Sequence, residues 1–284
     1  MKLKRHSANP ILERNLDNHW EAGSVFNPNV LYDNGIFRMV YRATNDVKIN
    51  KKGRYVSSIG YAQSKDGIHF KRFPDPLIVP DQEYEIGLGC EDPRVTKIDN
   101  KYFLYYTAVR GIGTEEEVRI ALATSRDFRT WKKHGIVGPK TRSKAAILFP
   151  EKIQGKYVVF YTWMPDRPLS SIMKVTFNNL NEVIKPPIGL IEDNINHYDK
   201  NVVFAPPLQV YRGAEVGAVP IKTDLGWLFI YCNANVSDHP QWTISVALLD
   251  INDPKRILAD VEILKPETKA ETTGLVKNVT SNFG

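Results

Sequence analysis

The sequence predicts an all-β fold, a five-bladed β-propeller that forms a single domain over residues 1–284. Three observations support this prediction. An aromatic-rich strand pattern recurs four times, each copy is followed by a second strand pattern, and 18 prolines and 18 glycines interrupt every longer helical periodicity. A β-sandwich is the competing fold, but a sandwich does not require repeats of this length.

Each repeat opens with an aromatic-rich strand that begins at a turn residue, glycine or asparagine. The repeats start roughly 55 to 70 residues apart, which suits a four-stranded propeller blade with its loops. The aromatic strands are predicted at residues 35–41, 100–106, 155–161 and 226–232, and their partner strands at 58–62, 119–123, 171–175 and 243–247.

The first two partner strands run into matching turns. Ser64 and Asp66 precede Phe70 with the same spacing that separates Ser125 and Asp127 from Trp131. Serine and aspartate side chains hydrogen-bond nearby backbone groups in turns, and the aromatic residue suits the strand that follows. The two turns are therefore expected to have the same conformation.

The end of the sequence resembles the beginning of another blade. Residues 275–279 have the pattern of a lead-in strand, and a fifth aromatic strand would fall beyond Gly284. We therefore expect the fifth blade to be incomplete within these residues, an arrangement that leaves sheet edges exposed.

Composition restricts the classes of function. The net charge is +6, but lysines and arginines are scattered apart from a short cluster at residues 2–6, so nucleic acid is not an expected partner. Cys90 and Cys232 lack the spacing of a metal site, and no metal or organic cofactor is expected. No segment has the pattern of a membrane span or a signal peptide, which predicts a cytoplasmic protein with no membrane partner. A chain whose signal peptide had been removed would look the same, and oligomerisation stays open.

Three polar stretches each precede an aromatic strand: residues 26–30, 89–95 and 211–220. In a propeller, equivalent points of successive blades converge on the central cavity. These stretches are therefore the expected binding site.

Residues 91–94, Glu-Asp-Pro-Arg, place two carboxylates and a guanidinium within four positions. A salt-bridged turn is the simpler interpretation, because Asp-Pro is common in turns. Glycoside cleavage, however, requires a carboxylic acid that protonates the leaving oxygen and, in an inverting hydrolase, a second carboxylate that activates water. Asp92 and Glu215 lie on different repeats and are candidates for these two roles.

The motifs taken together resemble glycoside hydrolase family 130, which comprises β-mannoside phosphorylases and β-mannosidases on a five-bladed propeller. Each motif alone is weak, but their joint occurrence from about Asn27 to the end of the chain is specific. The motifs are Phe26-Asn27-Pro28, Tyr41-Arg42, Gly89-x-Glu91-Asp92-Pro93-Arg94-Val95-Thr96, Leu148-Phe149-Pro150-Glu151-Lys152-Ile153 and Pro220-Ile221-Lys222-Thr223-x-x-Gly226-Trp227-Leu228.

The resemblance implies roles for individual residues. Asp92 matches the family's general acid, which in the phosphorylases acts through a hydroxyl of the bound mannose. The residues that match positions lining the sugar site are Asn27, Arg42, Glu91 and Arg94, with Lys144 and Glu271 as weaker matches.

The departures from the family pattern concern phosphate. Where the family's phosphorylases usually carry cationic or histidine ligands for phosphate, this sequence has Thr162, Glu215 and Cys232. An anion at Glu215 would repel phosphate and is suited to act as the base for water. A shift of the alignment by a few residues would make Arg212 a substitute cation, which keeps phosphorolysis open.

The sequence therefore predicts an inverting, exo-acting β-mannosidase that hydrolyses manno-oligosaccharides, with β-1,2 linkages favoured. Asp92 is the predicted acid and Glu215 the predicted base. One alternative is a β-1,2- or β-1,4-mannoside phosphorylase that releases mannose 1-phosphate. The other is a non-catalytic carbohydrate-binding propeller, which loss of the acid would favour.

Overall fold

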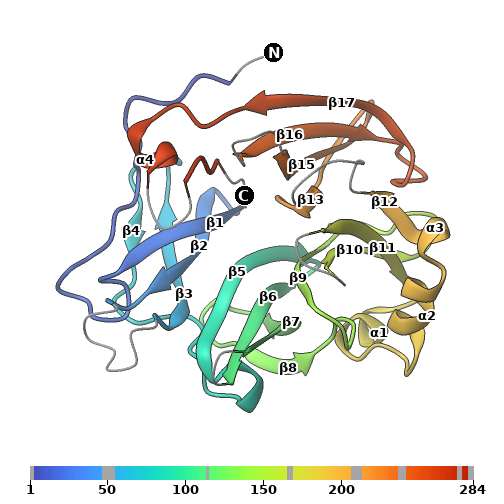
Figure 1. Ribbon diagram of the computed structural model, residues 1–284, viewed down its shortest axis with the longest axis horizontal. Coiled ribbons are helices and arrows are strands. Elements are labelled where there is room, and N and C mark those ends of the chain that lie inside the picture. Colours follow the sequence, from blue (N-terminus) through green and yellow to red (C-terminus); the bar gives the residue numbers. More distant parts are fainter. Residues whose placement is uncertain are drawn as a thin grey trace. The chain divides into compact units, whose positions relative to one another are not determined.

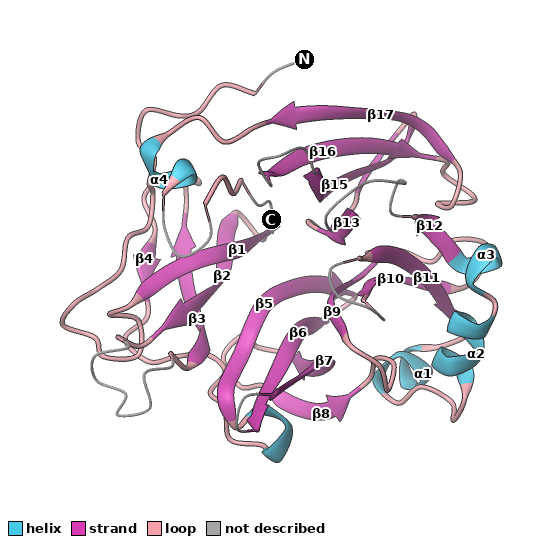
Figure 2. Cartoon of the chain, viewed as in Figure 1, coloured by secondary structure: helices cyan, strands magenta, loops and turns pink. Residues whose placement is uncertain are grey.

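The computed structural model describes residues 3–46, 55–112, 115–164, 169–205, 213–235, 241–273 and 277–280. These residues are mostly β-strand (Figure 2). Contacts divide the chain into two compact units, a first unit of residues 4–136 and a second unit formed mainly by residues 137–283. The single domain expected from the sequence stays a prediction, and each unit is described by itself.

The first unit contains two four-stranded antiparallel groups (Figure 1). A parallel bridge between Ser57 and Gly89 joins the groups into one sheet. A short 3-10 helix, η1 (Glu83–Glu85), precedes the second group. The strands are β1 (Ser24–Asp33), β2 (Ile36–Thr44), β3 (Ser57–Ser64), β4 (Lys71–Arg72), β5 (Gly87–Ile98), β6 (Lys101–Ile112), β7 (Glu115–Ser125) and β8 (Lys132–Ile136).

The second unit contains two further antiparallel sheets, with strand orders β12-β11-β10-β9 and β13-β15-β16-β17, and β14 pairs with β15. The strands are β9 (Ser143–Leu148), β10 (Tyr157–Trp163), β11 (Ser171–Phe177), β12 (Val202–Phe204), β13 (Gly213–Val216), β14 (Ile221–Thr223), β15 (Gly226–Asn235), β16 (Gln241–Leu249) and β17 (Ile257–Leu264).

Four short helices occur where the sequence predicted almost none. Between β11 and β12 lie α1 (Leu180–Ile184), α2 (Leu190–Asn196) and α3 (Tyr198–Asn201), and α4 (Lys269–Thr272) follows β17. The side chain of Asn179 accepts a hydrogen bond from the Glu182 amide and so caps the start of α1. None of the helices in the described part of the chain is long and apolar enough to cross a membrane.

The predicted strand repeat is confirmed. The four aromatic strands are β2, β6, β10 and β15, and their predicted partners are β3, β7, β11 and β16. The described residues thus form four antiparallel groups with the same internal order. Closure into a five-bladed propeller stays a prediction.

The two matching turns are also confirmed. Ser64 Oγ accepts from the amides of Asp66 and Gly67, and Asp66 Oδ1 accepts from those of Ile68 and His69. The second turn repeats the pattern from Ser125 and Asp127 to the amides of residues 127–130, with every distance within 0.1 Å of its counterpart. Equal spacing therefore produces equal hydrogen bonding.

The predicted lead-in strand at residues 275–279 is wrong in the part that the structure describes. The backbone oxygen of Asn278 accepts from the Trp242 amide, and Val279 forms a parallel bridge with Trp242. This segment thus pairs with β16 and does not open a further sheet. Residues 274–276 lie outside the described residues.

Aromatic rings join the two sheets of the second unit. Phe149 meets Trp227 edge to face with ring centroids 5.2 Å apart, and Phe160 meets Phe229 in the same way at 5.5 Å. All four rings are buried in one apolar cluster. Such pairs favour a fixed edge-to-face geometry, so the cluster brings β9 and β10 close to β13 and β15.

Candidate active site

Each of the four groups has a polar or charged residue in the same register pair, which we call the rung. One member of this pair directly follows a tyrosine in the aromatic strand, and the other lies on the preceding strand. The rungs are Phe26 with Arg42, Glu91 with Thr107, Lys144 with Thr162 and Glu215 with Cys232. Residues far apart in the sequence therefore share one structural position.

β-Bulges next to the rung alter the direction of the side chains. The register shifts between Phe26 and Asn29 in β1 and between Glu91 and Arg94 in β5. Within these bulges Asn27 has φ 49° and Asp92 has φ 48°, both in the left-handed region. Asparagine and aspartate tolerate this region better than most residues, and bulges commonly redirect a side chain beside a functional site.

In the first unit, four of the predicted site residues meet. Asn27 Nδ2 donates to Asp92 Oδ1 at 2.6 Å, and Arg42 Nη1 lies 3.5 Å from the same oxygen. Arg42 Nη2 forms an ion pair with Glu91 Oε1. The amide and the guanidinium thus fix both carboxylates of the Glu91-Asp92 pair.

Arg42 is itself held from several sides. Its Nε donates to Ser57 Oγ at 3.0 Å, and its guanidinium carbon lies 4.7 Å from the ring centroid of Phe26 and 5.7 Å from that of Tyr55. Burial lowers the pKa of Arg42, but Glu91 and Asp92 outweigh this effect and raise it above the ordinary value. Arg42 is therefore a fixed cation. Sequence reasoning missed Ser57, which lies one residue before a predicted partner strand and begins β3 in the structure.

Two further residues of the motifs are buried beside this cluster. Asn29 Oδ1 accepts from the Val95 amide at 2.8 Å and so ties β1 to β5. Arg94 is fully buried, and its Nη1 donates to the backbone oxygen of Pro93 at 2.8 Å. A contact of Arg94 with the sugar stays a prediction.

In the second unit, the three positions expected to bind phosphate lie together with Lys144. Lys144 Nζ forms an ion pair of 2.7 Å with Glu215 Oε2, and the Glu215 side chain is 3% exposed. Thr162 Oγ1 accepts from the Val216 amide at 2.9 Å, and Cys232 is the rung partner of Glu215. Glu215 is thus one half of a buried ion pair. The sequence interpretation assigned Lys144 to the sugar site as a weaker candidate and did not foresee its ion pair with Glu215.

The remaining predicted residues have different positions. Glu271 lies in α4, where its Oε2 accepts from the amides of Glu267 and Thr268 at 2.8 Å and completes a capping box with Thr268. This role at the helix start was not foreseen, and a sugar contact of Glu271 stays a prediction. Arg212 lies outside the described residues. Asp92 belongs to the first unit and Glu215 to the second, so their pairing as acid and base stays a prediction.

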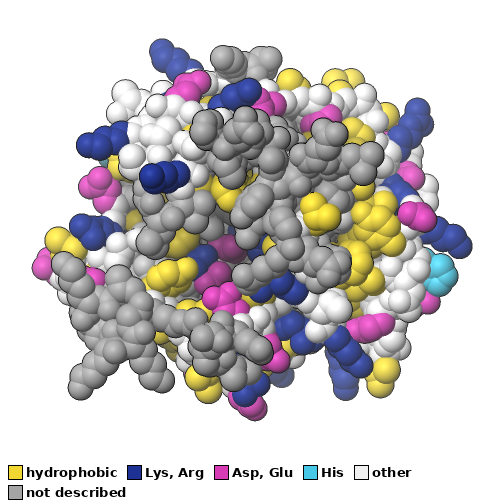
Figure 3. All heavy atoms as spheres, in the orientation of Figure 1, with side chains coloured by type: hydrophobic (Ala, Val, Ile, Leu, Met, Phe, Trp, Pro, Cys, Tyr) yellow, Lys and Arg dark blue, Asp and Glu magenta, His cyan; other side chains and the backbone are white. Residues whose placement is uncertain are grey.

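The charged side chains of the described residues are mixed in sign on the face drawn in Figure 3, where acidic and basic side chains are interspersed. Within the described ranges, no group of three or more histidine, cysteine, aspartate or glutamate residues could hold a metal ion.

In the first unit, a carboxylate pair, an amide and a guanidinium thus lie together on and beside the rung, and a pair of carboxylates is what glycoside cleavage uses. The sequence profile of glycoside hydrolase family 130, described as β-1,4-mannooligosaccharide phosphorylase, matches residues 2–283. The chain belongs to this family, whose enzymes act on mannosides.

Individual relatives agree with this assignment. Over the whole chain, the sequence is 38% identical to a 1,2-β-oligomannan phosphorylase and 37% identical to a β-1,2-mannobiose phosphorylase, both from Thermoanaerobacter sp. (strain X514), and 89% of each relative is covered. A solved structure concerns glycoside hydrolases of the family that target β-1,2-mannosidic linkages in Candida mannan. It superposes with a TM-score of 0.77 at 23% identity and covers 96% of this chain and 84% of that one.

Proposed function

We propose that the protein is a β-1,2-mannoside phosphorylase, which transfers a terminal mannosyl residue to inorganic phosphate and releases mannose 1-phosphate. The observation that carries this proposal is full-length identity of 38% and 37% to two phosphorylases of β-1,2-linked mannosides. The substrate class is manno-oligosaccharides.

The chemistry requires one acid. A phosphate oxygen attacks the anomeric carbon, the glycosidic bond breaks, and the leaving oxygen takes up a proton, so the configuration inverts. We assign the acid to Asp92, which delivers the proton directly or through a hydroxyl of the mannose. The contacts from Asn27 and Arg42 to Asp92 Oδ1 orient the carboxyl group, and such fixed orientation is a large part of enzymatic rate enhancement.

Phosphate also requires a cation to offset the loss of its hydration. Lys144 supplies a positive charge next to two of the positions where the phosphate ligands are replaced, because it is the register partner of Thr162 and forms an ion pair with Glu215. Because Lys144 lies 2.7 Å from Glu215, the two charges largely cancel. An isolated Glu215 carboxylate would repel phosphate, and the ion pair with Lys144 reduces this repulsion. The presence of Glu215 is therefore compatible with phosphorolysis.

Hydrolysis is the second candidate, and Glu215 itself favours it. A buried carboxylate occupies a position where the family's phosphorylases usually carry a cation, and a carboxylate is suited to take a proton from water. In this mechanism Lys144 would hold the Glu215 carboxylate in position through their ion pair.

Product analysis separates the two candidates. We expect β-1,2-mannobiose to be cleaved only when inorganic phosphate is present, with mannose 1-phosphate and mannose as products, measured by anion-exchange chromatography. Cleavage at the same rate in phosphate-free buffer, with mannose as the sole product, would establish hydrolysis. β-1,4-Mannobiose in a parallel reaction tests the linkage.

A further inference from the structure

A buried carboxylate, Glu85, lies beside the strands that carry the Glu91 rung. Its side chain is fully buried at the end of η1. Oε1 accepts from the Tyr106 hydroxyl at 2.6 Å, and Oε2 accepts from Lys133 Nζ at 2.7 Å and from the amides of Asp81 and Gln82 at 3.0 Å. Burial and the nearby Glu85 carboxylate raise the pKa of the Cys90 thiol. An ion of this kind is tolerated in the interior because many donors replace its hydration.

One of these donors, Tyr106, directly precedes the rung residue Thr107 in β6, and Thr107 is the register partner of Glu91 in β5. Glu85 therefore binds β6 one residue before the rung. A shift of Glu85 would act on the backbone of Glu91 and Asp92 without contacting either side chain.

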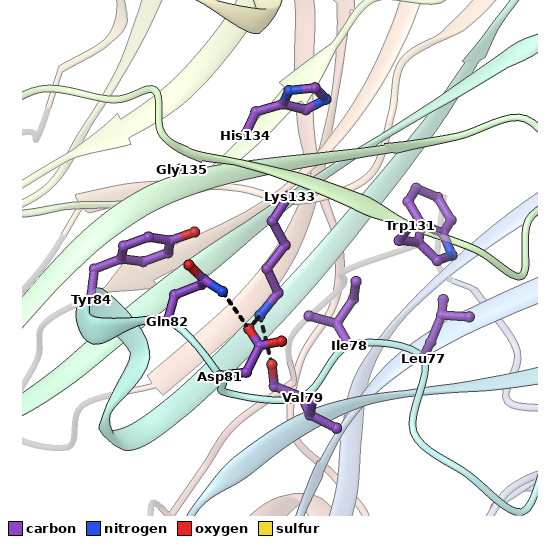
Figure 4. A pocket seen from close by; sticks show the side chains of 10 residues that line it. All are labelled: Leu77, Ile78, Val79, Asp81, Gln82, Tyr84, Trp131, Lys133, His134 and Gly135. Carbon is purple, nitrogen blue, oxygen red and sulfur yellow. Dashed lines mark hydrogen bonds and ion pairs between the residues drawn. The ribbon is translucent and has the colours of Figure 1, made fainter.

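The opposite end of this network reaches solvent. Lys133 Nζ also binds Asp81 Oδ1 at 2.6 Å and the backbone oxygen of Val79 at 2.6 Å (Figure 4). These residues line an open hollow of about 550 Å³ in the first unit. Burial lowers the pKa of Lys133, but Asp81 and Glu85 outweigh it and raise the pKa above the ordinary value. Lys133 thus stays charged and neutralises Glu85.

The same arrangement recurs in the other three groups. In each group, a buried tyrosine directly before the rung donates its hydroxyl to a carboxylate or amide oxygen. The pairs are Tyr41 with Glu21, Tyr106 with Glu85, Tyr161 with Asn194 and Tyr231 with Asp260, at 2.6 to 3.0 Å. A fourfold recurrence indicates that anchoring the rung is a property of the repeat.

We propose that Glu85 is a positioning residue for Glu91 and Asp92 and that it acts through Tyr106. This inference rests on the proposed role of Asp92 as the acid. Loss of the Tyr106 bond should therefore reduce turnover more than substrate binding, because misplacement of a catalytic group mainly raises the barrier of the chemical step.

The experiment compares Tyr106→Phe with Tyr102→Phe. Tyr102 lies in the same strand, and its hydroxyl donates to Asp33 Oδ2 at 2.5 Å, so both variants lose one buried bond to a carboxylate. Below the melting transition of both, we expect Tyr106→Phe to lower kcat about tenfold, with KM within about twofold of wild type, while Tyr102→Phe leaves kcat within about twofold. Equal kcat values for the two variants would overturn the inference. The comparison uses whichever product the wild-type enzyme releases, so failure of the phosphorylase proposal is recognised separately, in the wild-type reaction.

Discussion

Asn27 and Asp92 form a hydrogen bond of 2.6 Å although both have left-handed backbone conformations, with φ of 49° and 48°. Each lies in the bulge of its strand, β1 or β5. Conformations of this kind cost free energy in residues other than glycine and persist only where the surrounding structure fixes them. The backbone strain at Asn27 and Asp92 therefore occurs where the hydrogen bond between them orients the carboxyl group of Asp92, the proposed acid.

Replacing Asn27 with alanine tests this relationship. The variant loses the bond to Asp92 and places alanine at φ 49°, so we expect about 1–2 kcal/mol lower unfolding free energy and about tenfold lower kcat. Asn34→Ala is the matched control, because Asn34 has φ 51° in an exposed turn. Chemical denaturation and steady-state kinetics should show a stability loss in both variants and a loss of activity in Asn27→Ala alone.

Replacing Asp92 with asparagine removes the proposed acid and keeps the shape of the side chain. We expect kcat on β-1,2-mannobiose to fall by about 10²- to 10⁴-fold, while calorimetry still detects binding of the disaccharide. Asp127→Asn, in the turn after β7, should keep wild-type kcat. Substantial turnover by Asp92→Asn would exclude this residue as the acid.

The ion pair between Lys144 and Glu215 distinguishes phosphorolysis from hydrolysis. If Lys144 helps to bind phosphate, Lys144→Met should raise the KM for phosphate by about tenfold or more, whereas Lys152→Met, at an exposed position, should not. Under phosphorolysis Glu215→Gln should retain turnover, because no base is required for phosphate. Loss of all cleavage in Glu215→Gln would instead favour hydrolysis with Glu215 as the base.

The anchoring tyrosines predict loss of stability at alkaline pH. Burial raises the pKa of Tyr41, Tyr106, Tyr161 and Tyr231 above the ordinary value of 10.0, with additional contributions from Glu21, Glu85, Glu192 and Asp260. Because the folded pKa is the higher one, their contribution is complete below pH 10 and is lost as the pH rises above 10.

We therefore expect the unfolding free energy to fall from about pH 10 upward, by about 1.4 kcal/mol per pH unit for each such tyrosine. Denaturation at several pH values, followed by circular dichroism, measures this slope. Tyr231→Phe should make this slope smaller by about 1.4 kcal/mol per pH unit, the contribution of one tyrosine. Tyrosinate absorbance that appears well before unfolding in the wild type and is missing in Tyr231→Phe would show that the Tyr231 hydroxyl titrates in the folded protein.

Local patterns in the sequence were sufficient to predict the strands, their partners and the two Ser-Asp turns. These features depend on residues close together in the chain: alternation and aromatic content favour strands, and short side chains bond neighbouring amides. The motifs also identified Asn27, Arg42, Glu91 and Asp92 before their contacts were known. The short helices after β11 were missed because they are only four to seven residues long.

The sequence by itself determined the repeat, the family and the residue types available for chemistry. The tertiary structure decided which of these residues meet, because strand register and bulges set the direction of each side chain, and a shift of one residue reverses it. Packing between neighbouring strand groups then places Lys144 beside Glu215, and Arg42 beside Glu91 and Asp92. The burial of Glu85 beneath the rung likewise depends on contacts among η1, β5, β6 and β8, since no local pattern distinguishes this glutamate from an exposed one.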